Sequence, residues 1–288
     1  MFFLFRAGVC NEMIIVRIGA GMGNQMFMYA AGLSAAARLN TELKLAAWHF
    51  NAHSSPDRPY SLSCFPAITE ENATYSETWR ISPKIAVIRF ISGKHRVRRR
   101  YVFRFLLCEA ARKILSSKGI YSPHYFSYSP EFESIPDNTY ISGFWESEKI
   151  FAGIKDKVRT KFTFGQEYFN PQLSAKIRGC NSVALHVRRG DKAKGGIGSS
   201  EGYIRQAVAK MNSLTYDPEY FVFSDDIEWC KRTLPQIYDT NYTYVEGQIP
   251  AQDMALMSIC KHVIIGPSTF SWWGAWLNNN PDKIVIII

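Results

Sequence analysis

The second half of the chain alternates short apolar runs with segments whose apolar residues recur at helical spacing. The apolar runs predict strands at Ser182–Val187, Glu219–Phe223, Tyr242–Val245, His262–Ile265 and Lys283–Ile288. The segments between them predict helices at Tyr203–Met211, Ile227–Leu234, Gln252–Ile259 and Phe270–Leu277. Strands that alternate with helices indicate an α/β fold with a parallel, doubly wound sheet.

One similar unit stands near the start of the chain. Ile14–Ile18 is predicted to be a strand, and Gln25–Leu39, rich in Ala and Met, a helix capped by Asn24. The turn between them, Gly19–Gly23, permits close approach of the backbone to a ligand. It does not match the dinucleotide-binding pattern GxGxxG, because Asn24 stands where the last glycine belongs.

The length of 288 residues allows two domains. Residues 40–140 show no clear period, and Ser147–Thr160 predicts a helix that links two domains. We therefore expect an N-terminal domain at 13–160 and a C-terminal domain at 161–288. Residues 1–12 lack the basic start of a signal sequence, and we expect them to be a loose extension.

Two adjacent arginines, Arg188 and Arg189, directly follow the predicted strand Ser182–Val187. In open α/β sheets, ligands bind outside the carboxyl ends of the strands. Guanidinium groups match a diphosphate in both geometry and charge. The alternative is a solvated turn in which the arginines pair with surface acids.

A second candidate anion site lies in the turn Gly266–Ser271, between a predicted strand and a predicted helix. Ser268, Thr269 and Ser271 offer hydroxyl groups there, beside the free N–H groups of a helix start. Plain capping of the helix by Ser or Thr is the simpler interpretation. Together with the arginine pair on the same predicted sheet, however, this turn indicates a nucleoside diphosphate site.

Asp225 and Asp226 follow a third predicted strand. They could bind a metal, accept hydrogen bonds from a base or ribose, or cap the next helix. No side chains stand at metal-ligand spacing, so capping is expected for at least one of them. His186, at the end of an apolar strand, is more typical of a satisfied structural histidine than of a base.

The net charge of +9 suggests acidic small molecules or an anionic surface before nucleic acid. Lys94–Arg104 holds the densest basic cluster, with aromatic residues interleaved. It could be a solvated helix face, or it could contact anionic lipid headgroups or a lipid-linked pyrophosphate. Nucleic acid is the weakest option for one short cluster in a modestly charged chain.

The six cysteines include no CxxC pair and stand mostly among apolar residues. They are interpreted as reduced core thiols in a reducing compartment. No apolar run is long enough to span a membrane. These features favour a cytoplasmic protein.

Four motifs together resemble a known family. They are GxGNQMFxYA near the amino end, HVRRGDK, FSDD and STFSWWGAWL, and they span residues 19–277. In this order they resemble the bacterial α-1,2-fucosyltransferases of glycosyltransferase family 11. The second and fourth motifs are highly specific, whereas GxGNQ alone is weak.

The resemblance implies a GT-B-like fold of two facing Rossmann-type domains, with the donor site in the C-terminal sheet. It implies GDP-β-L-fucose as donor, no metal and no other cofactor, and inversion to an α-linked product. The expected acceptor is the 2-hydroxyl of a β-galactoside in a surface glycan of O-antigen or capsule type, which can be lipid-linked. The expected location is the cytoplasm, where the enzyme could be peripheral on the inner face of the membrane.

The resemblance also implies roles for individual residues. Arg188 would hold the diphosphate, Asp191 is the candidate general base, and Asn24 completes the expected catalytic group. The expected donor-binding residues are Gly21, Gly23, His186, Arg188, Arg189, Asp225, Asp226, Ser268, Thr269, Phe270 and Ser271. His186 with Asp225 or Asp226 would lie toward the guanosine. Asn24 and Gln25 would face the sugar and the acceptor.

Two other functions remain open. The chain could transfer a different sugar from a GDP-sugar or form another linkage, or it could be a non-catalytic module that binds a GDP-sugar or a glycan. The intact residues Arg188, Arg189 and Asp191 argue against a silent module. The segment 40–140 gives no indication of the acceptor.

Overall fold

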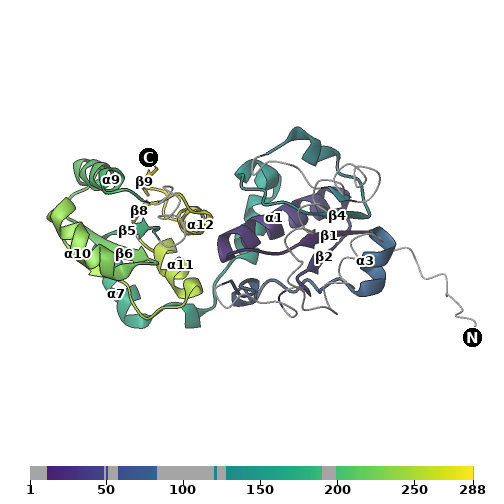
Figure 1. Ribbon diagram of the computed structural model, residues 1–288, viewed down its shortest axis with the longest axis horizontal. Helices are drawn as coiled ribbons and strands as arrows, with labels where there is room; N and C mark the ends of the chain where they lie inside the picture. Colours follow the sequence, from purple (N-terminus) through teal and green to yellow (C-terminus); the bar gives the residue numbers. More distant parts are fainter. Residues whose placement is uncertain are drawn as a thin grey trace, which may run out of the picture. The chain divides into compact units, whose positions relative to one another are not determined.

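The computed structural model describes residues 12–48, 50, 58–82, 120–121, 128–189 and 199–287. The chain divides into two compact units (Figure 1). The first comprises Met1–Leu62 and Ile68–Lys161, and the second comprises Ser63–Ala67 and Phe162–Ile288. The main division thus falls one residue after the predicted position, and a short piece of the N-terminal half belongs to the second unit. Of the expected extension 1–12, only Glu12 is among the described residues.

The first unit contains a four-stranded sheet in the order β2-β1-β4-β3, in which the paired strands are parallel. Its strands are β1 (Met13–Arg17), β2 (Glu42–Ala46), β3 (Ile120–Tyr121) and β4 (Thr139–Ile141). Its helices are α1 (Met22–Leu39), α3 (Tyr75–Ile81) and α6 (Lys155–Lys161), with 3-10 turns η2 (Pro130–Ser134) and η3 (Glu148–Ile154). The 3-10 turn η1 (Leu62–Cys64) spans the point where the chain first passes from this unit to the second.

Helix α1 begins earlier than the sequence predicted. Gly21 is its N-cap, with extended backbone angles and no side-chain cap, so Asn24 lies inside the first turn instead of capping the helix. The helix ends at Asn40, whose φ of 52° places it in the left-handed region. Gly32 lets α1 approach β1 closely, because a Cβ there would lie 2.6 Å from Val16 Cγ1.

The predicted linking helix at 147–160 is also different. The segment forms η3, interrupted by non-helical angles at Phe151, and then α6. Phe151 is fully buried and packs against Phe27 of α1, with ring centres 6.4 Å apart. This buried aromatic contact coincides with the break in the helix.

The second unit contains a parallel five-stranded sheet in the order β7-β6-β5-β8-β9. Its strands are β5 (Asn181–Val187), β6 (Pro218–Ser224), β7 (Tyr242–Tyr244), β8 (His262–Ile264) and β9 (Val285–Ile286). Its helices are α7 (Pro171–Gly179), α9 (Glu201–Leu214), α10 (Ile227–Ile237), α11 (Pro250–Ser258) and α12 (Thr269–Leu277), with the 3-10 turn η4 (Gln166–Tyr168). The predicted parallel, doubly wound sheet is confirmed, and most predicted element ends differ from the observed ones by one to three residues.

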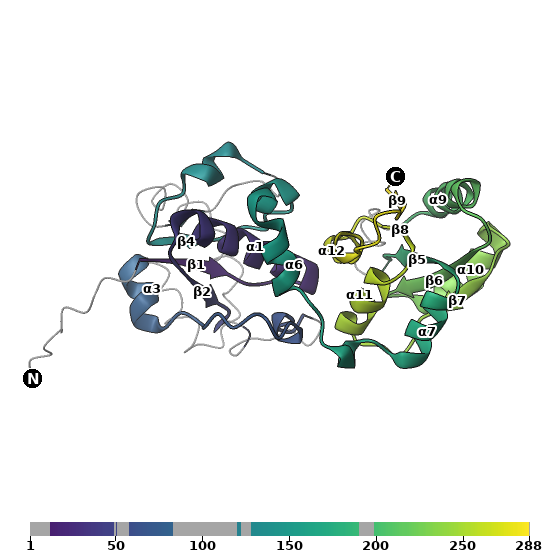
Figure 2. The same ribbon diagram turned by 180° about the vertical axis from the view of Figure 1, so that it is seen from behind.

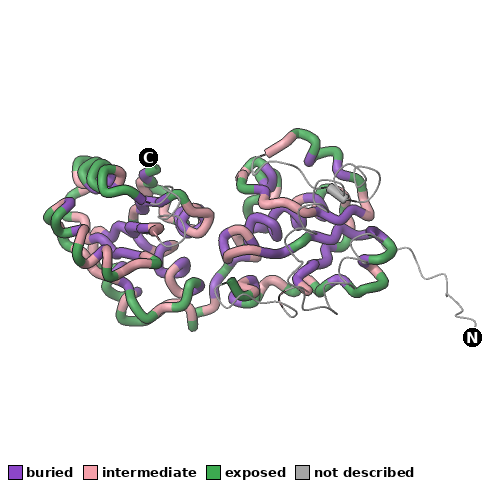
Figure 3. Tube along the Cα trace, viewed as in Figure 1, coloured by how far each residue is buried: buried purple, intermediate pink, exposed green. Residues whose placement is uncertain are grey.

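Two apolar clusters cover the two faces of this sheet, and Figures 1 and 2 show the helices that form them. Helices α9 and α10 pack on the face that carries Val183, Leu185 and Val187. Helices α7, α11 and α12 pack on the other face, which carries Ala184. Because side chains alternate along a strand, His186 points to this second face. Figure 3 shows the buried residues gathered in the two sheets and the helix surfaces toward them.

The segment Ser63–Ala67 joins the second unit through aromatic packing. The ring of Phe65 lies 5.0 Å from that of Phe162 and 4.8 Å from that of Phe164. Phe162 in turn packs edge-on against Trp273 of α12, at 5.0 Å. The chain therefore passes between the units at three places, after residues 62, 67 and 161.

The four described cysteines, Cys64, Cys180, Cys230 and Cys260, have free thiols, as predicted. No helix in the described ranges is long and apolar enough to cross a membrane.

Candidate functional site

Three strand ends of the second unit meet at one edge of its sheet. Strand β5 lies between β6 and β8, so the turns that follow these strands are neighbours. Ser224 Oγ donates a hydrogen bond to the carbonyl of Val187, at 2.8 Å. A Cβ at Gly266 would lie 2.9 Å from Ser199 Oγ and 3.1 Å from the carbonyl oxygen of His186. The structure therefore brings three of the four sequence motifs together, and the turn after β8 leaves little room for a side chain at Gly266.

Asp225 holds the arginine pair. Its Oδ2 lies 2.8 Å from Arg188 Nη1, and its Oδ1 accepts a hydrogen bond from the backbone N–H of Arg189, also at 2.8 Å. The side chains of Arg188 and Asp225 are 31% and 26% exposed. Asp225 thus orients the arginines. Its expected position toward the guanosine stays a prediction.

Arg189 is turned toward helix α10. The carbon of its guanidinium group lies 3.9 Å from the centre of the Trp229 ring, a cation–π contact. Its Nε is 3.8 Å from Asp226 Oδ2, while Asp226 Oδ1 accepts from the N–H of Trp229 and caps the helix. The predicted capping by at least one of the two aspartates is confirmed. Arg188 is therefore the better candidate for binding an anion.

His186 is 6% exposed, and its ring centre lies 5.7 Å from that of Phe270. Burial lowers the pKa of His186 to about 4; the charge of Asp225 raises it in part, and that of Arg188 lowers it further. Its Nδ1 is buried without a hydrogen-bond partner among the described residues. The expectation of a satisfied structural histidine is therefore wrong: the ring is neutral near pH 7 and retains an unused polar atom.

The start of helix α12 is capped as the simpler interpretation predicted. Ser268 Oγ accepts from the N–H of Phe270 at 3.3 Å. Ser271 is fully buried, and its hydroxyl lies 3.3 Å from the carbonyl of Gly266 and 3.2 Å from that of Ser268. Ser271 thus braces the turn and does not present its hydroxyl to a ligand. Thr269 and Phe270 are half-buried at the helix start, whose backbone dipoles favour an anion.

The first motif lies in the first unit, at the carboxyl end of β1. Gly21 is half-exposed, and a Cβ there would meet no atom within 4 Å. Asn24 is half-buried in the first turn of α1, and Gly23 is buried. Gln25 is fully buried, and its side chain is bonded to three backbone groups of its own unit. The expectation that Gln25 faces a sugar is therefore not met in this geometry.

Two sequence predictions lie outside the described residues. The first concerns Asp191, the candidate base, which lies outside the described residues together with Gly190 and Lys192. The second is the basic cluster Lys94–Arg104. The catalytic role of Asp191 and the membrane contact of the cluster stay predictions.

Sequence reasoning missed Asp253, in the first turn of α11. Its Oδ1 is buried without a hydrogen-bond partner in the part of the chain that the structure describes. Burial raises its pKa to about 7. Acidic residues are common in the first turn of a helix, so the sequence gave no indication that this carboxyl is buried without a hydrogen-bond partner. Nor did the sequence indicate the role of Ser199, which exchanges two hydrogen bonds with the backbone of Arg188, at 2.8 and 3.2 Å.

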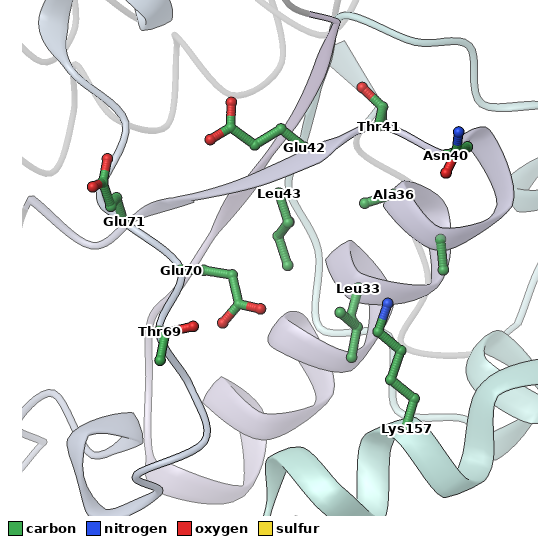
Figure 4. Close-up of a pocket in the computed structure, with 11 residues that line it drawn as sticks. Leu33, Ala36, Asn40, Thr41, Glu42, Leu43, Thr69, Glu70, Glu71 and Lys157 are labelled. Carbon is green, nitrogen blue, oxygen red and sulfur yellow. The ribbon is translucent and has the colours of Figure 1, made fainter.

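A cavity of about 550 Å³ lies elsewhere, in the first unit (Figure 4). It is lined by Leu33, Ala36, Ala37, Asn40, Thr41, Glu42, Leu43, Thr69, Glu70, Glu71 and Lys157. Glu70, at its wall, is already bonded to the hydroxyl of Tyr29 at 2.9 Å and to Lys161 at 2.7 Å. The cavity lies at the end of α1 and the start of β2, away from the turn of the first motif. It holds none of the predicted site residues.

Across the described ranges, no group of three or more His, Cys, Asp or Glu side chains is placed to hold a metal ion. The acids at the candidate site, Asp225 and Asp226, are instead paired with arginines. Metal independence stays a prediction.

Comparison with known proteins identifies the family. The chain is 32% identical to the alpha-1,2-colitosyltransferase of Escherichia coli, over 96% of this chain and 91% of that protein. It is 30% identical to galactoside alpha-(1,2)-fucosyltransferase 1 of Mus musculus, over 48% of this chain and 41% of the relative. The crystal structure of NodZ alpha-1,6-fucosyltransferase soaked with GDP-fucose matches with a TM-score of 0.51 and 16% identity, over 93% and 92% of the two chains.

The solved structure and the family match support different conclusions. The likeness to the solved structure concerns the fold alone, which is GT-B-like, as predicted. Residues 112–288 match the family described as Glycosyl transferase family 11, and they include three of the four motifs. With this match over more than half of its length, the chain belongs to glycosyl transferase family 11.

Proposed function

We propose that the protein is an inverting glycosyltransferase that moves L-fucose from GDP-β-L-fucose to the 2-hydroxyl of a β-galactoside in a surface glycan. The observation that carries this proposal is the arrangement of Arg188. Its guanidinium is oriented by Asp225 at the sheet edge where the start of α12 also lies. A fixed guanidinium beside a helix start is suited to a diphosphate.

The reaction requires these groups when the sugar bond breaks. The acceptor oxygen bonds to the anomeric carbon from the face opposite the leaving group, the bond to the β-phosphate oxygen breaks, and GDP leaves. Negative charge grows on that phosphate, and Arg188 and the dipole of α12 would neutralise it without a metal. The proton of the acceptor hydroxyl must pass to a base, and Asp191 is our candidate.

The guanine base needs hydrogen-bonding partners, in contrast to the cationic groups that bind the diphosphate. His186 and Asp253 both offer buried polar atoms without partners among the described residues. His186 points to the sheet face that α11 covers, and Asp253 belongs to α11. The N1–H and N2–H groups of guanine form a donor pair that a carboxylate accepts side by side. A ligand that donates there would offset the cost of burying Asp253.

Acceptor binding belongs in this proposal to the first unit. The turn at Gly21 is open to close approach, and Asn24 lies in the first turn of the helix that follows it. An amide side chain can both donate to and accept from sugar hydroxyls. We place the reaction in the cytoplasm, on a galactoside acceptor that can be lipid-linked.

The proposal is tested by supplying purified protein with GDP-fucose and GDP-mannose, with and without β-galactosides. We expect transfer from GDP-fucose to galactose O2, with an α-linked product and no dependence on added metal. Transfer to another position, or a β-linked product, would contradict the mechanism. If the protein neither transfers nor hydrolyses any of the GDP-sugars, that result would favour the non-catalytic module.

A second donor sugar is favoured by one observation. The full-length relative at 32% identity is named a colitosyltransferase. GDP-colitose therefore belongs in the same donor series. A kcat/KM higher with GDP-colitose than with GDP-fucose would move the assignment to that sugar while leaving the roles of Arg188 and Asp225 unchanged.

A further inference from the structure

The side chain of Gln25 is completely used inside the protein. It is fully buried in the first turns of α1. Its Nε2 donates to the carbonyl of Ala20 at 2.9 Å and to the carbonyl of Pro59 at 2.8 Å. Its Oε1 accepts from the backbone N–H of Ser61 at 2.8 Å. All three partners are backbone groups.

These bonds join two loops that are far apart in the sequence. Ala20 belongs to the turn between β1 and α1 and has a φ of 62°. Pro59 and Ser61 belong to the segment 58–61, 34 and 36 residues away from Gln25. The turn stands at the carboxyl end of β1, the edge where ligands of α/β sheets bind. Gln25 therefore determines how segment 58–61 lies beside this edge.

Only an amide of this length meets these demands. Two carbonyls require two N–H donors, and the N–H of Ser61 requires an acceptor. Glutamate would place a carboxylate against two carbonyl oxygens, and methionine would leave all three backbone groups without a partner. Segment 58–61 also presents surface: Arg58 and Pro59 are exposed, and Tyr60 is half-buried, edge-on to Phe50 with ring centres 5.5 Å apart.

We propose that Gln25 is a positioning residue for acceptor binding, which fixes segment 58–61 as part of the surface that receives the sugar. The inference rests on the proposed function for its substrate, a neutral galactoside. Tyr60 supplies an aromatic ring, and the apolar C–H groups of a sugar pack on the faces of such rings. Gln25 acts through this loop and does not touch the acceptor.

The test uses Gln25→Met, which keeps the volume and removes three hydrogen bonds, and Gln25→Glu, which keeps the acceptor for Ser61. Amide hydrogen exchange of the peptide that contains Ser61 should be faster by about tenfold or more in Gln25→Met, because the N–H of Ser61 loses the acceptor that protects it from exchange. With GDP-fucose and phenyl β-D-galactoside, the KM for the galactoside should rise by about tenfold. The Kd for GDP should stay within about twofold, since it binds to the other unit.

Ser34→Ala is the matched control on the same helix. Ser34 Oγ donates to the carbonyl of Ile150 at 2.7 Å, away from segment 58–61. This variant should leave the galactoside KM unchanged. Tyr60→Ala tests the loop without touching α1, and it should raise the galactoside KM but not the Kd for GDP.

The outcomes separate the two proposals. Unchanged exchange at Ser61 in Gln25→Met, or an unchanged galactoside KM in Tyr60→Ala, would overturn the role of Gln25. If Gln25→Met does not fold, Gln25→Glu and Tyr60→Ala decide the same question. A wild-type protein that transfers no sugar to any galactoside would refute the proposed function, while the exchange at Ser61 would still report whether Gln25 holds the loop.

Discussion

Asp225 contacts both members of the arginine pair, with one carboxylate oxygen for each. Oδ2 pairs with the guanidinium of Arg188, and Oδ1 accepts from the backbone of Arg189. A partly exposed ion pair of this kind contributes little to stability, typically about 0–1 kcal/mol. Its value lies in geometry: the guanidinium of Arg188 is oriented before a ligand arrives, so less entropy is lost on binding.

Arg188→Lys should abolish most turnover and leave the fold intact. Lysine keeps the charge but loses the planar fork that can contact Asp225 and a phosphate together. We expect kcat to fall by roughly a hundredfold or more, as when an oxyanion donor is removed, with little change in the thermal midpoint. Arg189→Lys is the control, because Arg189 packs on Trp229, and its effect on kcat should be much smaller. A near-normal kcat for Arg188→Lys would refute its assignment to the diphosphate.

GDP should bind equally well with and without divalent cations. The acids nearest the arginines are already paired with them, and the charge that a cation would supply comes from Arg188 and the start of α12. Calorimetry in EDTA and in Mg²⁺ or Mn²⁺ measures this directly. A strict cation requirement would contradict the proposed site.

Asp253 should make stability depend on pH. Its pKa is raised to about 7 in the folded chain, so between about pH 4 and pH 7 the folded state holds more protons than the unfolded state. The free energy of unfolding should therefore fall through this window as the pH rises. Asp253→Asn should remove that part of the slope and be more stable than wild type at pH 8. Urea unfolding of both proteins from pH 4 to pH 8 measures the difference, and parallel curves would contradict the burial of this carboxyl.

The same variant tests guanine binding. Asparagine cannot accept two donors side by side as a carboxylate does, so the Kd for GDP should rise by about tenfold. The Kd for ADP, measured in the same titration series, is the comparison. An equal effect on both nucleotides would show that Asp253 does not read the base.

Gly32→Ala should destabilise the first unit. Alanine has the higher helix propensity, but its Cβ would lie 2.6 Å from Cγ1 of the fully buried Val16. Overpacking of this kind costs about 1–3 kcal/mol, and we expect a lower thermal midpoint. Gly202→Ala in α9 is the control, because no atom lies within 4 Å of its Cβ, and it should be neutral or slightly stabilising. A rise in the midpoint for Gly32→Ala would mean that α1 can move away from β1.

The sequence was sufficient where one local signal decided the structure. The apolar runs of β5, β6 and β8 are buried on both faces, so their strands and the turns after them were predictable from composition. The role of Gln25 was not predictable, because its partners Pro59 and Ser61 lie in a segment without periodicity. Asn24 resembled a cap because the sequence does not show that Gly21 already has the extended backbone of an N-cap. Asp253 became unusual only through burial, which depends on how α11 packs.

The chain passes between the two units three times, and this affects how chimeras of related proteins should be designed. A chimera that joins residues 1–161 of this chain to the corresponding C-terminal part of a relative would keep Phe65 but replace its partners Phe162 and Phe164 by the relative's residues. The aromatic cluster of the second unit would then consist of residues from two different parent proteins. A recombination scheme that follows the fold would move residues 63–67 together with the C-terminal half, as a separate insert, so that the second unit is transplanted whole.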